Sequence, residues 1–180
     1  MSRRAVVFVT LFVVALVALA VVVEIVNDDS GTTTVPSAGT GSFASALSTA
    51  GPAVAPFAGL TEVKGAIGGT CLRFAVADSL DERVAGLRGN SADLGPYDGM
   101  VFVFPSSTQT AFTMAGVQDP LDIAFFDREG ARNSTRAMKP CPDKAETECP
   151  VYRADGPYVF ALETKPGHLP SGPLTACSST

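Results

Sequence analysis

An apolar run near the N-terminus constrains this chain more than any other feature. Residues 5–23 are apolar except for Thr10. A helix of that length spans roughly 28 Å, close to the ~30 Å hydrocarbon core of a bilayer. Arg3 and Arg4 precede the run, so the positive-inside rule places the N-terminus in the cytoplasm and the remainder of the chain outside. We therefore expect residues 1–26 to form a cytoplasmic tip and a single-pass transmembrane anchor.

A cleaved signal peptide is the alternative interpretation of the same run. A small-residue cleavage site ends at Ala20, and cleavage there would release a secreted protein. Residues 21–23 are all valine and carry the apolar run past that site, so its length favours an anchor in the cytoplasmic membrane. Either interpretation places residues 27–180 outside the cytoplasm.

The middle and the end of the chain differ in composition. Residues 27–60 are mostly Gly, Ser, Thr, Ala and Pro without a sustained hydrophobic period, which predicts a disordered linker. Residues 61–180 alternate apolar segments with turn residues and are long enough to bury one core. We expect this extracytoplasmic part to be the only folded domain.

Short β-like patterns dominate residues 61–180. Strands are expected at residues 71–77, 100–104, 121–126 and 158–162, each bounded by Gly, Pro or Asp, and a hairpin turn is expected at residues 127–130. One helix is expected after Ser79, which forms a capping box with Glu82. Its apolar residues would be Leu80, Val84 and Leu87, and Gly89 would close it. The fold class is α+β, a single β-rich domain of mostly antiparallel strands with one short helix.

The chain has four cysteines, and all of them follow the apolar run. In an oxidising compartment they predict two disulfides, for which three connectivities exist. Cys141 and Cys149 could close a short ring, and Cys71 with Cys177 would fasten the ends of the domain. A redox or metal site is disfavoured because no C-x-x-C motif is present and the chain has one histidine.

Charge and composition exclude several kinds of partner. The net charge of −5 disfavours binding to nucleic acid, which needs clustered Lys and Arg. The single histidine, His168, lies in a Gly- and Pro-containing stretch and is expected to be an exposed loop residue. We predict no metal and no cofactor, a membrane as the one identifiable partner, and leave any ligand or protein partner open.

A set of residues between positions 74 and 167 has a recognisable order and spacing. It consists of Glu82-Arg83, Gly86-Leu87, residues 98–104, Phe112, Met114, residues 120–123, Phe125, Asp127, Gly130, Cys141, Cys149-Pro150, Tyr152, Tyr158-Val159, Leu162-Glu163 and Gly167. In these positions the chain resembles the domain-of-unknown-function 192 family of small, often exported prokaryotic proteins. The resemblance implies a compact β-rich domain and no particular reaction.

One segment departs from that family pattern. Members usually carry Trp-Met-Lys-Asn-Thr where this chain has residues 113–117, Thr-Met-Ala-Gly-Val. If the family's run forms a ligand surface, this chain has lost most of it. Phe112 and Met114 remain as candidate binding residues, with burial in the core as the alternative.

Three carboxylates interrupt or border apolar strand patterns: Asp98, Asp122 and Glu163. In glycoside hydrolysis, two carboxylates ~5–9 Å apart can act as the general acid and as the base or nucleophile. Alternatively, each accepts hydrogen bonds from loop amides or pairs with Arg73 or Arg83, as buried carboxylates generally must.

Three functions follow from these features. The favoured one is a non-catalytic binding or scaffolding module, held at the outer face of the cytoplasmic membrane as part of the cell envelope. The second is a carboxylate-dependent hydrolase acting on envelope glycans, which requires the three carboxylates to converge in a cleft. The third is a structural envelope protein without a ligand. No nucleophile, base and orienting group recur at a recognised spacing, so the sequence makes catalysis the weaker interpretation.

Overall fold

The computed structural model describes residues 41–89 and 93–178. The predicted anchor or signal peptide of residues 1–26 lies outside this range. Within the described part of the chain, no helix is long and apolar enough to cross a membrane.

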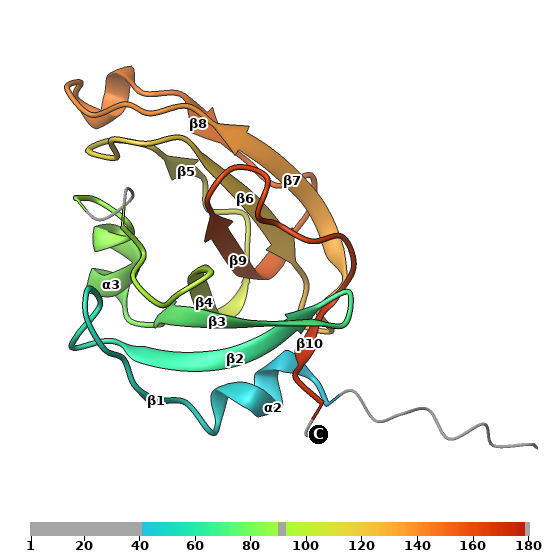
Figure 1. The fold of residues 1–180 in the computed structure, drawn as a ribbon. Coiled ribbons are helices and arrows are strands. Elements are labelled where there is room, and N and C mark those ends of the chain that lie inside the picture. Colours follow the sequence, from blue (N-terminus) through green and yellow to red (C-terminus); the bar gives the residue numbers. More distant parts are fainter. Residues whose placement is uncertain (1–40, 90–92, 179–180) are drawn as a thin grey trace, which may run out of the picture. The chain divides into compact units, whose positions relative to one another are not determined.

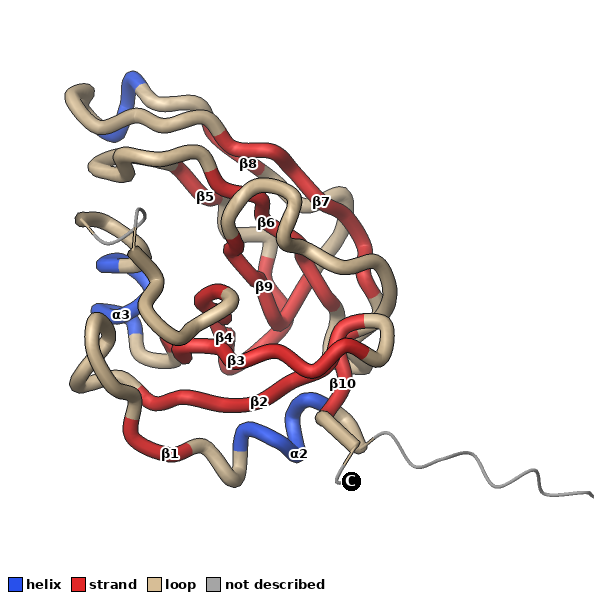
Figure 2. The backbone as a smooth tube through the Cα atoms, in the orientation of Figure 1, coloured by secondary structure: helices blue, strands red, loops and turns tan. Residues whose placement is uncertain are grey.

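Strands are the main regular secondary structure of the described backbone (Figures 1 and 2). The elements in chain order are α2 (Phe43–Leu47), β1 (Gly51–Pro52), β2 (Thr61–Ile67), β3 (Thr70–Ala77), α3 (Leu80–Ala85), β4 (Gly99–Thr108), β5 (Phe112–Thr113), β6 (Leu121–Phe126), β7 (Arg132–Met138), the 3-10 helix η1 (Glu146–Glu148), β8 (Val151–Tyr152), β9 (Tyr158–Thr164) and β10 (Leu174–Ala176).

One large sheet organises the domain. Its strand order is β1-β2-β3-β4-β9-β6-β7, with β10 also paired to β2, on the same edge as β1, and β5 pairs separately with β8. Every pair of named strands is antiparallel except β3 with β4, which α3 connects. The expected β-rich domain of mostly antiparallel strands is confirmed, as are the strands predicted around residues 71–77, 100–104, 121–126 and 158–162.

The sheet buries both of its faces. Side chains of one face, which we call the α3 face, pack with the segments around α3 and β5, and include Ala75, Met100, Phe102 and Ile123. Side chains of the opposite face, the α2 face, pack with α2 and β10, and include Phe74, Val101, Ala124 and Leu162. Strand β9 is central and every one of its residues is buried. Figure 1 shows α2 beside β2, with α3 at the left of the view and β10 at the right.

The folded domain begins earlier than the composition suggested. Phe43 of α2 is 1% exposed and meets the rings of Phe74 and Phe160 edge-on, with centroids 6.3 and 5.3 Å away. Strand β1 then pairs with β2. Residues 43–60 therefore belong to the domain, and the prediction of a linker reaching to residue 60 is wrong over this stretch. Two aromatic residues far apart in this segment, Phe43 and Phe57, give no periodicity from which their burial could be predicted.

The helix after Ser79 forms, but its apolar side chains do not all face the core. The Ser79–Glu82 capping box is confirmed, and the helix ends at Gly86 (φ 49°) instead of the predicted Gly89. Leu80 and Val84 are 69% and 59% exposed, while Leu87 is 1% exposed. The left-handed turn at Gly86 redirects the chain so that Leu87 is buried after the helix has ended. The predicted apolar stripe is therefore wrong for its first two members.

Two disulfides join the four cysteines. Cys141 pairs with Cys149 across the segment that carries η1, and Cys71 at the start of β3 pairs with Cys177, which follows β10. The predicted disulfides are confirmed, in the connectivity that fastens the ends of the domain. The hairpin turn at residues 127–130 is also confirmed, with Gly130 at φ 84°.

Candidate functional site

A pocket of about 600 Å³ opens beside α3. Residues 83–88 of α3 and its exit form one wall, and residues 104–108 and 110–113, from the end of β4 to β5, form the other. Phe102 and Glu163 reach it from the sheet, and Leu80, Val117 and Glu146 complete the lining. Ligand-binding pockets of small organic molecules have volumes of ~300–1,000 Å³, so this one is large enough for such a ligand.

Two exposed apolar side chains of α3 face this pocket. Leu80 and Val84 line it, which gives a reason why they point away from the core. An apolar helix face that is left in water costs free energy unless something covers it. The exposed stripe therefore marks the pocket wall as an apolar contact surface.

Aromatic rings form the opposite wall. Phe112 meets Phe102 and Phe104 edge-on, with ring centroids 5.1 and 6.5 Å away. The Tyr158 hydroxyl donates a hydrogen bond to the Thr110 carbonyl (2.6 Å), which ties the connection before β5 to β9. This packing holds Phe112 in place beside the pocket, so its ring can contact a ligand without reordering.

The structure separates the two candidate binding residues. Phe112 is half-buried and lines the pocket. Met114 is completely buried in the core and is not among the lining residues. The segment of residues 113–117 that departs from the family pattern nevertheless contributes Thr113 and Val117 to the pocket.

Glu163 is the buried ionisable group of this site. It is 5% exposed on β9, where its neighbours across the sheet are Met100 on β4 and Ile123 on β6. Within the part of the chain that the structure describes, no hydrogen bond or ion pair reaches its carboxyl group. Burial raises the pKa of this carboxyl from 4.5 to about 8, because a carboxylate loses its hydration there and gains no partner.

The other charged side chains at the pocket already have partners. Arg83 donates from Nη1 to the carbonyls of Asp78 and Val103, and its guanidinium lies 5.0 Å from the centroid of the Phe104 ring. Arg88 pairs with Glu146 at 3.4 Å. Neither arginine neutralises Glu163.

The three predicted carboxylates do not converge. Asp98 accepts a hydrogen bond from the Arg73 amide (2.8 Å) before β4 begins. Asp122 accepts one from the Gly167 amide (2.8 Å) and lies opposite Thr164 on β9. Because successive strand residues point to opposite faces, Asp122 is on the other side of the sheet from Glu163.

This arrangement removes the premise of the hydrolase hypothesis. Asp122 accepts from the loop amide of Gly167, as the alternative interpretation expected, whereas Asp98 accepts from the Arg73 amide of β3, and neither lines the pocket. Glu163 alone reaches it. The predicted partner Arg73 binds Glu62 instead, in a cluster that also includes the Tyr97 hydroxyl.

Sequence reasoning missed two contributions to the pocket. Ser106 and Ser107 line it, although they read as ordinary loop residues, and Arg83 lies along its wall. No local pattern distinguishes a serine beside a pocket from a serine in any exposed loop. Glu163, in contrast, was detectable as an acidic residue in an otherwise apolar strand.

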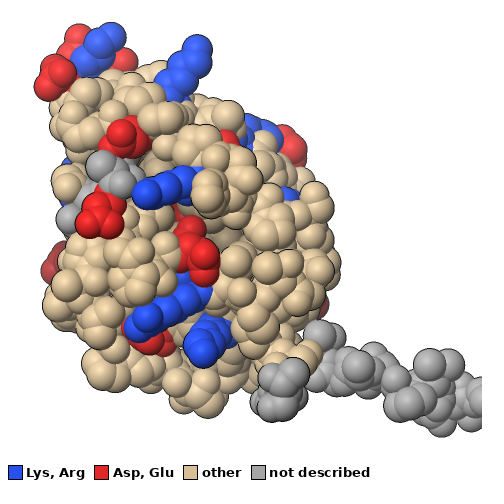
Figure 3. All heavy atoms as spheres, viewed as in Figure 1, with Lys and Arg blue, Asp and Glu red and all other residues tan. Residues whose placement is uncertain are grey.

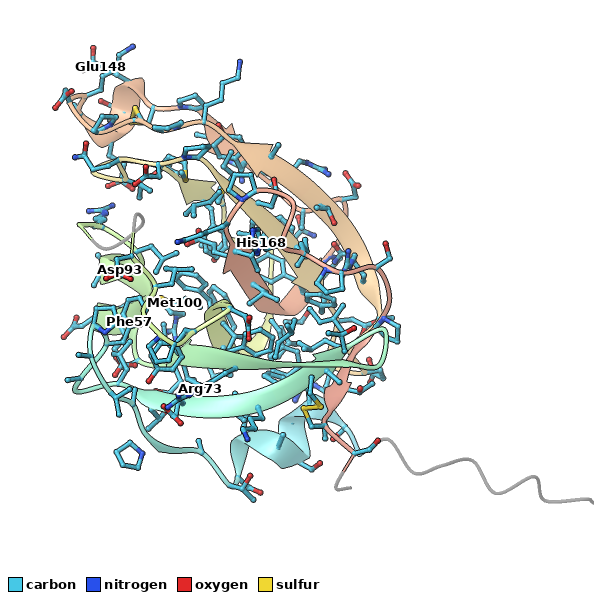
Figure 4. The ribbon with its side chains drawn as sticks, in the orientation of Figure 1. Phe57, Arg73, Asp93, Met100, Glu148 and His168 are labelled. Carbon is cyan, nitrogen blue, oxygen red and sulfur yellow. A yellow bond between two sulfur atoms is a disulfide. The ribbon has the colours of Figure 1, made fainter. Side chains whose placement is uncertain are left out.

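The single histidine does not line the pocket. His168 is exposed in the loop after β9, as expected (Figure 4). Figure 3 shows basic and acidic side chains interspersed on the face in view. Among residues 41–89 and 93–178, no three His, Cys, Asp or Glu side chains lie close enough together to hold a metal ion.

Comparisons with known proteins identify relatives without an assigned role. Residues 62–172 match the model of DUF192, a family described as "Uncharacterized ACR". No curated protein matches the chain. A crystal structure of a protein of unknown function from Novosphingobium aromaticivorans DSM 12444 is similar, with a TM-score of 0.57, 26% identity and coverage of 72% of this chain and 95% of that one.

A second solved structure shares the fold. It is a protein from Sinorhizobium meliloti 1021 described as a proposed transcription regulator, with a TM-score of 0.52 and 20% identity. The match covers 63% of this chain and 90% of that one. At this identity, the likeness concerns the arrangement of the strands alone.

Proposed function

The chain belongs to the DUF192 family, whose description names no activity, and we propose that its folded domain is a non-catalytic module that binds a small organic molecule in the pocket beside α3. The observation that carries the proposal is Glu163, a buried carboxyl without a partner in the described protein, which faces a pocket with apolar walls. A buried polar group without a partner costs free energy, and a bound ligand can remove that cost.

Binding fits this pocket better than catalysis. Hydrolysis of a glycan needs a second carboxylate that works with the first, and Asp98 and Asp122 bind backbone amides elsewhere. Glu146 is the other carboxylate at the pocket and is paired with Arg88. Glu163 thus lacks a partner for acid–base work among the described residues.

A thermal-shift screen tests this function. The full chain is screened against a panel of small organic molecules of different charge, and each hit is repeated with Ser107→Trp, which places an indole in the pocket mouth. Ser171→Trp, at an exposed position outside the pocket, is the matched control. A ligand at 100 times its Kd stabilises by about 2.7 kcal/mol, a shift of several degrees. The pocket function is wrong if no ligand shifts the protein, or if Ser107→Trp leaves every shift intact.

We further propose that this module acts outside the cytoplasm, tethered to the membrane by residues 5–23. The length of the apolar run and the two disulfides support it, because disulfides persist in oxidising compartments. The full chain, expressed in a bacterium, should sediment with membranes after alkaline extraction. Its cysteines should resist alkylation until a reductant is added. A protein that stays in the soluble fraction would contradict the membrane tether. Cysteines that are alkylated without a reductant would contradict the oxidising compartment.

A further inference from the structure

The carboxyl of Glu163 needs a hydrogen-bond donor or a cation beside it, and no described residue supplies one. The two strands that flank β9 present Met100 and Ile123 to it, and neither can donate a hydrogen bond. The next residue across β4 is Ala75. The side chain of Glu163 nonetheless lines a pocket that is open to solvent, so a ligand can reach it.

The other charged side chains that line the pocket are Arg83, Arg88 and Glu146. Arg88 pairs with Glu146, and Arg83 donates to two backbone carbonyls and stacks on Phe104. Both arginines therefore already make polar contacts, whereas the carboxyl of Glu163 makes none within the described chain. A cationic ligand would pair with the carboxylate form of Glu163, and that form would repel an anionic ligand.

The walls of the pocket suit an apolar body attached to that cation. Phe104 and Phe112 offer ring surfaces, and Leu80 and Val84 offer exposed aliphatic side chains. Aromatic faces also attract a nearby cation. Together, these groups define a site for a compact apolar molecule with one charged end.

We infer that the pocket recognises a small organic amine, with its protonated nitrogen on the carboxylate of Glu163 and its apolar body between α3 and the Phe104–Phe112 wall. The inference rests on the proposed function, because it names the ligand class of the same pocket. The bound nitrogen donates to the carboxylate oxygens, and no covalent bond forms.

The pH dependence of binding follows from this pairing. Free Glu163 holds a proton up to about pH 8, so an amine must displace that proton at lower pH. The other charged groups that line the pocket are Arg83, Arg88 and Glu146. Affinity for an amine should therefore rise by about tenfold or more from pH 6.5 to pH 8.5.

Titration calorimetry with three probes of similar shape tests the inference. The probes are phenethylamine, neutral 2-phenylethanol and anionic phenylacetate, added to the full chain in phosphatidylcholine nanodiscs, with empty nanodiscs as the blank. Phenethylamine should bind at least tenfold more tightly than 2-phenylethanol at pH 8.5, and phenylacetate should not bind. At pH 6.5, buffers of different ionisation enthalpy should show release of about one proton for each amine bound.

Two variants place the effect at the carboxyl. Glu163→Gln keeps the shape of the side chain and removes its charge, so the preference for phenethylamine over 2-phenylethanol should fall below threefold and the proton release should vanish. Asp143→Asn, at an exposed carboxyl outside the pocket, should keep both. Proton release is measured on the unmodified protein, so the test does not depend on whether Glu163→Gln folds.

The amine inference and the pocket function can fail separately. Equal binding of the two probes, affinity for the amine that falls as pH rises, or a preference that survives in Glu163→Gln would overturn the inference. If 2-phenylethanol then binds and Ser107→Trp blocks it, the pocket function stands. If neither probe binds, the inference is wrong, and the thermal-shift screen decides whether the pocket function is wrong as well.

Discussion

Glu163 of β9 lies directly opposite Met100 of β4 in the antiparallel ladder, so a carboxyl group is paired with a thioether in the middle of the sheet. Strand β9 could have carried an apolar side chain here without loss of packing, as it does at the neighbouring Ala161 and Leu162. A polar group in such a position lowers stability. Its presence at the floor of a pocket is the basis of the functional proposals.

The cost of Glu163 should be visible in the stability of the protein without ligand. Its carboxyl has a pKa of about 8 in the folded state and 4.5 as a reference, so the folded state holds a proton that the unfolded state has lost between these values. The free energy of unfolding should be independent of this group below pH 4.5 and should fall by about 3–5 kcal/mol as pH rises through 8.

Urea denaturation at pH 4.5, 6.5 and 8.5 measures this effect. Glu163→Gln should remove most of the fall and should be more stable than the unmodified protein at pH 8.5. Asp143→Asn, at an exposed carboxyl, should leave the pH dependence unchanged. A fall of the same size in Glu163→Gln would assign the pH dependence to other groups.

Phe43 should contribute strongly to stability even though it precedes the main sheet. Its ring is 1% exposed and packs between Phe74 and Phe160. Phe43→Ala should lower the free energy of unfolding by about 3–4 kcal/mol, because it leaves a cavity beneath the sheet. Val54→Ala, at a side chain that is 49% exposed, is the control and should change it by less than about 0.5 kcal/mol. If Phe43→Ala and Val54→Ala lower the free energy of unfolding equally in a urea titration, residues 43–60 would belong to the linker and not to the folded domain.

The two disulfides should differ in their contributions. Cys71 and Cys177 are 106 residues apart, and Cys141 and Cys149 are 8 apart. The longer loop loses more entropy when the unfolded chain is cross-linked, so replacing the first pair by alanine should cost about 4–5 kcal/mol and replacing the second about 2–3 kcal/mol. Denaturant midpoints of the two double variants give the order, and a larger loss from the short ring would contradict it.

The exposed side of α3 should matter for ligand binding and little for folding. Val84 is 59% exposed, so Val84→Thr should change the free energy of unfolding by less than about 0.5 kcal/mol and weaken binding in the pocket. Leu87 is 1% exposed, and Leu87→Ala should cost about 2–4 kcal/mol. Similar losses of stability in both variants would place Val84 in the core.

Local patterns were sufficient for the strands and the start of α3. Residues 121–126 are apolar except for Asp122 and are bounded by turn residues, and the Ser79–Glu82 capping box is encoded within four residues. The functional site was only partly accessible in this way. Glu163 was one of three carboxylates selected because an acid in or beside an apolar strand is unusual, and the other two, Asp98 and Asp122, accept hydrogen bonds from backbone amides outside the pocket.

The sequence by itself determined the class of the domain, the main strands and a set of three candidate carboxylates, because these depend on neighbours a few positions apart. Only the tertiary structure decided which carboxyl reaches a pocket, that Leu80 and Val84 line it, and that Phe43 belongs to the core. These properties depend on residues such as Arg83, Phe112 and Glu163 being brought together from distant parts of the chain. Sheet pairing and the burial of apolar surface set that placement, and neither is encoded in a short window of sequence.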